Sequence, residues 1–88
     1  MQHNPEIWLQ AADDAANSFL SQPPAQREAG NDNGYCKISV LSSLEVLADA
    51  VYYLNYPLYQ FIKIHANQWY SHGMSHPPEF AATWAKRR

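Results

Sequence analysis

Cysteine, glycine and long apolar runs are scarce in this chain of 88 residues, and each scarcity excludes a class of protein. Cys36 is the only cysteine, so no disulfide can form within the chain. The three glycines stand singly, not in the glycine-rich loops that bind phosphate groups. No stretch approaches the roughly 18 consecutive apolar residues of a membrane span. With a lone thiol and no basic-then-apolar leader, we expect a cytoplasmic protein that does not bind a membrane.

Charged side chains are also few, at 16% of the chain, and they sum to a net charge of -2. Positions 51–88 hold four of the six basic residues and nine of the twelve aromatic residues. Aromatic stacking and phosphate contacts are typical of nucleic-acid binding. However, four basic residues on a chain with a net negative charge are fewer than the basic stripe that such proteins usually carry. Nucleic-acid binding by the C-terminal half is therefore the alternative function. The basic residues concerned are Lys63, Lys86, Arg87 and Arg88.

Apolar residues, in contrast, make up 47% of the chain and recur at helical spacing. The first helix is predicted over 5–21, because Asn4 can cap it, Pro5 suits the first helical position and Glu6 complements the positive end of the helix dipole. Residues spaced three and four apart share one side of a helix, which gives this segment an apolar face and a polar face. The apolar face is predicted to contain Trp8, Ala11, Ala12, Ala15, Phe19 and Leu20.

The second helix is predicted to begin within 35–41 or at Ser42 and to end near Tyr56. Residues 35–41 alternate between apolar and polar as a strand would, but the chain has no second alternating run to pair with them. Helix is therefore favoured, unless this segment pairs with another copy of the chain. Ser42 and Glu45 fit a capping box if the helix begins there. The main apolar face of this helix contains Leu44, Leu47, Ala48, Val51 and Leu54.

A second apolar stripe lies on another side of the same helix and consists of Val46, Ala50 and Tyr53. A helix that is apolar over most of its circumference is either central in a bundle or in contact with another molecule. A chain of this length has little interior in which to bury both stripes. We therefore predict self-association, as a homodimer or another homo-oligomer, through Val46, Ala50 and Tyr53.

Two further helices complete the set. One begins at Pro57, which cannot continue the preceding helix, and ends near His72 because Gly73 supplies a natural stop. The other is short and begins at Pro77 or Pro78. Their apolar faces contain Leu58, Phe61, Ile62, His65 and Trp69 in the longer helix and Phe80, Ala81, Trp84 and Ala85 in the shorter one.

The fold class expected from these segments is all-α. Three or four helices pack as a small bundle in a single domain over residues 1–88, since a chain of this length has no room for two cores. The segment 22–34 contains two prolines, two glycines and almost nothing apolar, so it is predicted to be a long exposed loop.

Three histidines in the second half of the chain are candidate metal ligands. His65 and His72 lie about 10 Å apart along one helix, whereas each ligand of a zinc ion lies about 2 Å from the metal. His76 follows the helix stop, so the chain would have to fold back to bring it near the other two. We expect no metal and no cofactor, with His65 a core residue beside Phe61 and Trp69.

Candidate catalytic residues are equally sparse. The carboxylate pair Asp13 and Asp14 is predicted to lie on a solvated helix face, and Glu45 and Asp49 lie one turn apart with no opposing acid. Neither Cys36 nor any serine stands in a recognisable nucleophile signature. We therefore expect a protein that is not an enzyme.

The surplus of tyrosine and tryptophan instead favours a protein–protein interaction module, because interfaces are enriched in these residues. The hypothesis is a small regulator or inhibitor that occupies a surface of a larger protein. The residues predicted to contact that partner are Tyr53, Tyr56, Tyr59, Trp69 and Tyr70.

Overall fold

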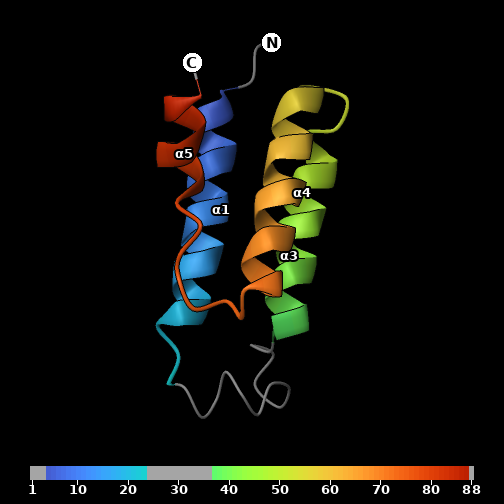
Figure 1. Ribbon diagram of the computed structural model, residues 1–88. Coiled ribbons are helices and arrows are strands. Elements are labelled where there is room, and N and C mark those ends of the chain that lie inside the picture. The colour runs from blue at the N-terminus through green and yellow to red at the C-terminus, as the bar shows by residue number, and fades with distance from the viewer. Residues whose placement is uncertain (1–3, 24–36, 88) are drawn as a thin grey trace.

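The computed structural model describes residues 4–23 and 37–87, which form four helices and no strand within those ranges (Figure 1). The predicted all-α fold, a small bundle of three or four helices, is confirmed. Most of the loop predicted at 22–34 lies outside the described residues. The helices are α1 (Pro5–Leu20), α3 (Lys37–Ala50), α4 (Tyr56–Ser71) and α5 (Phe80–Lys86).

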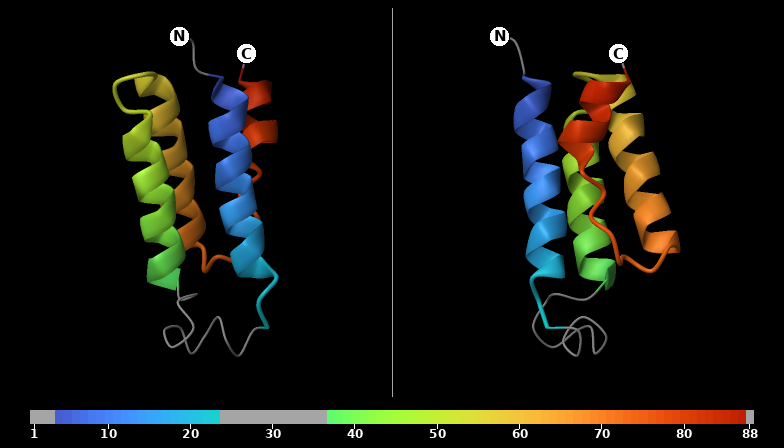
Figure 2. Two further views of the ribbon diagram at one scale, coloured as in Figure 1. Left: turned by 180° about the vertical axis from the view of Figure 1, so that it is seen from behind. Right: turned by 60° about the vertical axis from the view of Figure 1, so that its left-hand side comes forward.

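The four helices of the described residues form two units, a helical hairpin of α3 and α4 and a pair of α1 and α5. α3 and α4 run antiparallel to each other, and α1 packs along them with the short α5 at its side (Figures 1 and 2). After α4 the chain turns back along α1 before it enters α5. The turn between α3 and α4 therefore lies at the same end of the bundle as the start of α1 and the end of α5 (Figure 1).

α1 begins as predicted, since the Asn4 side chain accepts a hydrogen bond of 2.9 Å from the backbone N–H of Glu6. Its buried face differs from the predicted one. Ala11 is exposed and Trp8 is half-buried. Four alanines fill two neighbouring stripes of this helix, so spacing alone left open which stripe faces the core. The buried residues are Leu9, Ala12, Ala16 and Phe19.

α3 includes Lys37 to Leu41, so helix was the right choice for that part of the segment 35–41, whose first two residues lie outside the described part of the chain. Ser42 lies inside the helix instead of capping it. The helix ends at Ala50, six residues before the predicted end. Residues 51–54 continue as turns, in which the N–H of Leu54 bonds to the carbonyl oxygen of Val51 at 3.0 Å. β-Branched and aromatic side chains, such as those of residues 51–53, are weak helix formers.

α4 begins where the turn ends. The Asn55 side chain accepts a 3.1 Å hydrogen bond from the N–H of Leu58, and Pro57 occupies the first turn, where a missing N–H costs nothing. At the other end Gly73 has φ +85°, and the N–H groups of Gly73 and Met74 bond to the carbonyl oxygens of Tyr70 and Trp69. This closing motif buries Met74 and confirms Gly73 as the helix stop.

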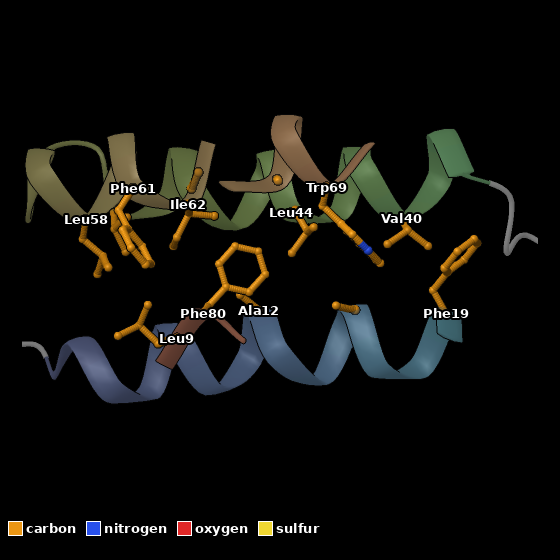
Figure 3. Close-up of a cluster of buried hydrophobic side chains, with 14 of the residues drawn as sticks. Leu9, Ala12, Phe19, Val40, Leu44, Leu58, Phe61, Ile62, Trp69 and Phe80 are labelled. Carbon is orange, nitrogen blue, oxygen red and sulfur yellow. The ribbon is translucent and has the colours of Figure 1, made fainter. Parts of the chain in front are cut away.

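The core fills the space between α1 and the hairpin, and α5 contributes one large side chain to it (Figure 3). Phe80 is fully buried and lies near Ala12. The rings of Phe19 and Trp69 meet edge to face at 6.0 Å near Val40. Trp69 is therefore a core residue, 5% exposed, and is not available as the partner contact predicted from the sequence.

Candidate protein-interaction surface

Exposed large apolar side chains gather on one part of the described surface. Six of the nine that the structure exposes in residues 4–23 and 37–87 lie on α3, in the turn after it or at the first residue of α4. Four of the six lie close together at the end of α3 and the start of α4, whereas Ile38 lies about 12 Å from Val46 along the helix at 1.5 Å per residue. Apolar residues that gather are a stronger sign of a contact surface than residues scattered singly. The six are Ile38, Val46, Tyr52, Tyr53, Leu54 and Tyr56.

Four tyrosines form a cluster at the α3–α4 turn: Tyr52, Tyr53, Tyr56 and Tyr59, hereafter the tyrosine cluster. The ring of Tyr52 lies at its centre, 4.8 Å from Tyr53, 5.4 Å from Tyr56 and 4.8 Å from Tyr59, in near-perpendicular contacts. The rings of Tyr56 and Tyr59 stack at 5.5 Å. Edge-to-face and offset contacts are the favoured aromatic geometries, so the rings hold one another in place.

Local sequence explains how the tyrosine cluster forms. The turn at residues 51–55 places the adjacent pair Tyr52 and Tyr53 against the first turn of α4, where Tyr56 and Tyr59 are three residues apart on one face. The Gln60 side-chain amide donates a hydrogen bond of 3.2 Å to the Tyr56 hydroxyl. The cluster thus depends on the early end of α3.

One ion pair borders the tyrosine cluster. Lys63 Nζ donates a 3.0 Å hydrogen bond to Glu45 Oε2 and lies 5.8 Å from the centre of the Tyr59 ring. That hydrogen bond is the main reason why the pKa of Lys63 is raised above its ordinary 10.5, and burial opposes it. Lys63 is therefore cationic at neutral pH, and Glu45 offsets its charge. Asp49 is also exposed, one turn before Tyr53.

The structure brings together three of the five predicted partner contacts. The tyrosine cluster contains Tyr53, Tyr56 and Tyr59. Tyr70 lies about 16 Å beyond Tyr59 along α4, at 1.5 Å per residue. Tyr52 was missed. In a helix that continues to residue 56, Tyr52 belongs to neither apolar stripe. The turn that the structure shows instead places Tyr52 at the centre of the tyrosine cluster.

The three residues predicted for self-association are all exposed. Val46 and Ala50 lie on the outer face of α3, and Tyr53 follows in the turn with 93% of its surface exposed. Leu54 was predicted in the buried stripe of the same helix and is also exposed.

The three histidines line an open hollow of about 510 Å³ near the end of α4. His65 Nδ1 lies 2.9 Å from the carbonyl oxygen of Phe61, and His72 Nδ1 lies 2.7 Å from that of Gln68. Within residues 4–23 and 37–87, no three His, Cys, Asp or Glu side chains are placed to hold a metal ion. His65 is half-buried rather than a core residue.

Asp13 differs from its prediction as a solvated carboxylate. Its two oxygens accept hydrogen bonds from the N–H groups of Phe80 at 2.6 Å and Ala81 at 3.1 Å, which are the first two residues of α5. Glu79, at the cap position, makes no such bond with its own side chain. Asp13 therefore fastens α5 to α1, and its neighbour Asp14 accepts a bond from Gln10 on the outer face.

Comparison of the chain with models of protein families, with curated proteins and with solved structures finds no match in any of the three. Of the helices in the described part of the chain, none is both long and apolar enough to cross a membrane.

Proposed function

We propose that the protein is a non-enzymatic interaction module that docks on a larger partner protein through the tyrosine cluster, as a small regulator or inhibitor. The observation that carries this proposal is the cluster itself, at one end of the bundle, in which the Tyr52 ring contacts the other three rings. Three of its members are exposed, namely Tyr52, Tyr53 and Tyr56. The lone thiol of Cys36 supports placing this activity in the reducing cytoplasm.

Two physical properties of the tyrosine cluster support docking. Tyrosine offers a large apolar area with a hydroxyl at its edge, and it loses little conformational entropy because it has few rotatable bonds. Here the rings also fix one another, so less freedom remains to be lost when a partner binds. The partner surface we propose is apolar, with hydrogen-bonding groups at its rim that meet the tyrosine hydroxyls.

Nucleic-acid binding has less support from the geometry. Lys63 is paired with Glu45, and the Arg87 guanidinium lies 4.5 Å from the centre of the Trp84 ring. The exposed carboxylate of Asp49, one turn before Tyr53, would repel a phosphate backbone. We therefore treat nucleic acid as an outcome of the test.

The test is site-specific photo-cross-linking in a lysate of the source cells. A photoreactive phenylalanine replaces Tyr56 in one protein and Tyr70 in a matched control, since both lie on α4 and are 49% and 40% exposed. We expect a discrete cross-linked protein from position 56 that is absent from position 70 and is lost when Tyr52 and Tyr53 are also changed to serine. Equal cross-linking at both positions, or none at either, would contradict the proposal.

The same experiment separates the two ligand classes. A cross-linked species that disappears on nuclease treatment, and that weakens steeply with added salt, would replace the proposal with the nucleic-acid alternative. A protein partner held by aromatic contacts should survive both treatments.

A further inference from the structure

An open hollow of about 310 Å³ lies between the first half of α4 and α5. Its apolar wall comes from Pro57, Phe61 and Ile64, which are spaced four and three residues apart and so lie on one side of α4. Thr83 and Arg87 line the hollow from the side of α5, which runs antiparallel to α4 (Figure 1). The tyrosine cluster does not line it, so this hollow is a separate candidate site.

Arg87 carries the permanent charge of the hollow. Its guanidinium carbon lies 4.5 Å from the centre of the Trp84 ring and 5.6 Å from that of Phe61, and cation–π contacts of this kind hold the group in place. Within residues 4–23 and 37–87, no carboxylate pairs with it and no oxygen accepts a hydrogen bond from its side chain. A guanidinium has five N–H donors in a planar fork that fits a carboxylate. The rings therefore position Arg87 while its hydrogen-bonding edge stays available.

The charges around the hollow favour an anionic ligand. The larger hollow of the three histidines adjoins it, since His65 lines both. Among the described residues, the two hollows are lined by Arg87 and three histidines and by no acidic side chain, although Asp and Glu outnumber Lys and Arg by eight to six in the whole chain. On the neighbouring elements, Glu6 is exposed at the start of α1, Asp13 accepts hydrogen bonds from the first N–H groups of α5, and Glu79 lies at the opposite end of α5 from Arg87. A cationic ligand would therefore find no counter-charge in the lining.

We propose that this hollow binds a small organic carboxylate with a flat apolar body. The carboxylate oxygens accept hydrogen bonds from the Arg87 guanidinium, and the body packs against Phe61 and Ile64. Ile64 is 51% exposed, and the removal of its apolar surface from water favours binding. The Thr83 hydroxyl, on the same side of the hollow as Arg87, offers a further donor.

Size and charge together select this ligand class. Sites for small molecules have volumes of about 300–1,000 Å³, mostly apolar linings and a few polar groups that fix the orientation of the ligand. The hollow is at the lower end of that range, which suits a molecule of one or two rings. One guanidinium balances the single charge of a carboxylate, whereas a phosphate monoester carries nearly two charges and a nucleic-acid backbone needs a row of cations.

The test is a titration of the protein with cinnamate, followed by methyl NMR of Ile64 and Thr83. We expect saturable shifts of both methyl resonances, with a dissociation constant in the millimolar range or below for a ligand of this size. Cinnamyl alcohol has the same flat body without the charge. It should bind at least about tenfold more weakly, because it forms no charge-assisted hydrogen bond with the guanidinium.

Two variants locate the charge that binds the carboxylate. Arg87→Gln should weaken the binding of cinnamate by at least about tenfold and leave that of cinnamyl alcohol nearly unchanged. Lys86→Gln is the matched control, because Lys86 is the neighbouring exposed cation and does not line the hollow. It should leave both affinities nearly unchanged, since water and salt screen an exposed charge. Helix content by circular dichroism confirms that each variant is folded.

Several outcomes would overturn the proposal. The absence of saturable shifts at Ile64 and Thr83 would show that the hollow does not bind the probe. Equal affinity for cinnamate and cinnamyl alcohol, or equal losses in the two variants, would remove the role of Arg87. Tighter binding of cinnamyl phosphate than of cinnamate would overturn the carboxylate as the ligand class. Because the titration contains no partner protein, its result is independent of the docking proposal.

Discussion

α1 and α3 are similar in length, at 16 and 14 residues, but they differ in what they show to water. α1 buries Leu9 and Phe19 and turns mainly polar residues outward, with Ile7 as its one exposed large apolar residue. α3 buries Leu44 on one side and exposes Ile38 and Val46 on the other. The outer face of α1 is mainly polar, as expected for a surface in contact with water. The outer face of α3 exposes apolar residues that do not pack in the core.

The largest expected effect separates the two faces of α3. Leu44→Ala should lower the free energy of unfolding by about 2–5 kcal/mol, because it opens a cavity where the leucine is fully buried. Val46→Ala, two residues away but 69% exposed, should change it by less than about 0.5 kcal/mol. Urea unfolding at protein concentrations too low for dimerisation measures both. Similar losses for the two variants would mean that Val46 is packed within the monomer.

A smaller effect tests how α1 holds α5. Asp13→Ala should destabilise the protein by about 1–2 kcal/mol, because the N–H groups of Phe80 and Ala81 lose their acceptor beside the core. Asp14→Ala is the control, as its carboxylate is exposed and bonds only to the nearby Gln10 among the described residues, and should cost less than about 0.5 kcal/mol. Urea unfolding and hydrogen exchange at Phe80 report the difference. Equal effects for Asp13 and Asp14 would contradict the capping role.

Some helix boundaries were predictable from neighbouring residues, but α3 ends six residues before its predicted end, and α5 begins at Phe80 instead of the predicted Pro77 or Pro78. Asn4 and Pro5 start α1, and Gly73 ends α4, because caps and positive φ are local requirements. Asp13 was not predictable in this way. Its hydrogen bonds reach 67 and 68 residues along the chain, so they exist only once the bundle has formed.

The candidate surface was also predicted only in part, because the sequence pattern is local whereas burial depends on the folded bundle. Periodicity grouped Val46, Ala50 and Tyr53, and all three are exposed, but periodicity cannot say whether a grouped face meets the core or the solvent. For Trp69 the interpretation as a contact was wrong, because it shares a helix face with the buried Leu58 and Ile62. Composition marks a tryptophan as suited to an interface, and only packing decides whether the core takes it.

The smallest expected effect concerns the edge of α3 that faces α4. Glu45→Gln removes the ion pair with Lys63, and exposed pairs of this kind contribute about 0.2–1 kcal/mol. The folded-state pKa of Lys63 is raised above 10.5, so its contribution is fully present at neutral pH and is lost as the pH rises past that value. The difference in unfolding free energy between wild type and Glu45→Gln should therefore close at high pH. Glu79→Gln, whose side chain makes no cap bond, is the control and should show no such closure. A difference that stays constant through the same pH range would mean that Glu45 stabilises α3 by something other than the charge of Lys63. The side of α3 that faces α4 would then differ less from its outer face, because no ion pair would hold it to a neighbouring helix.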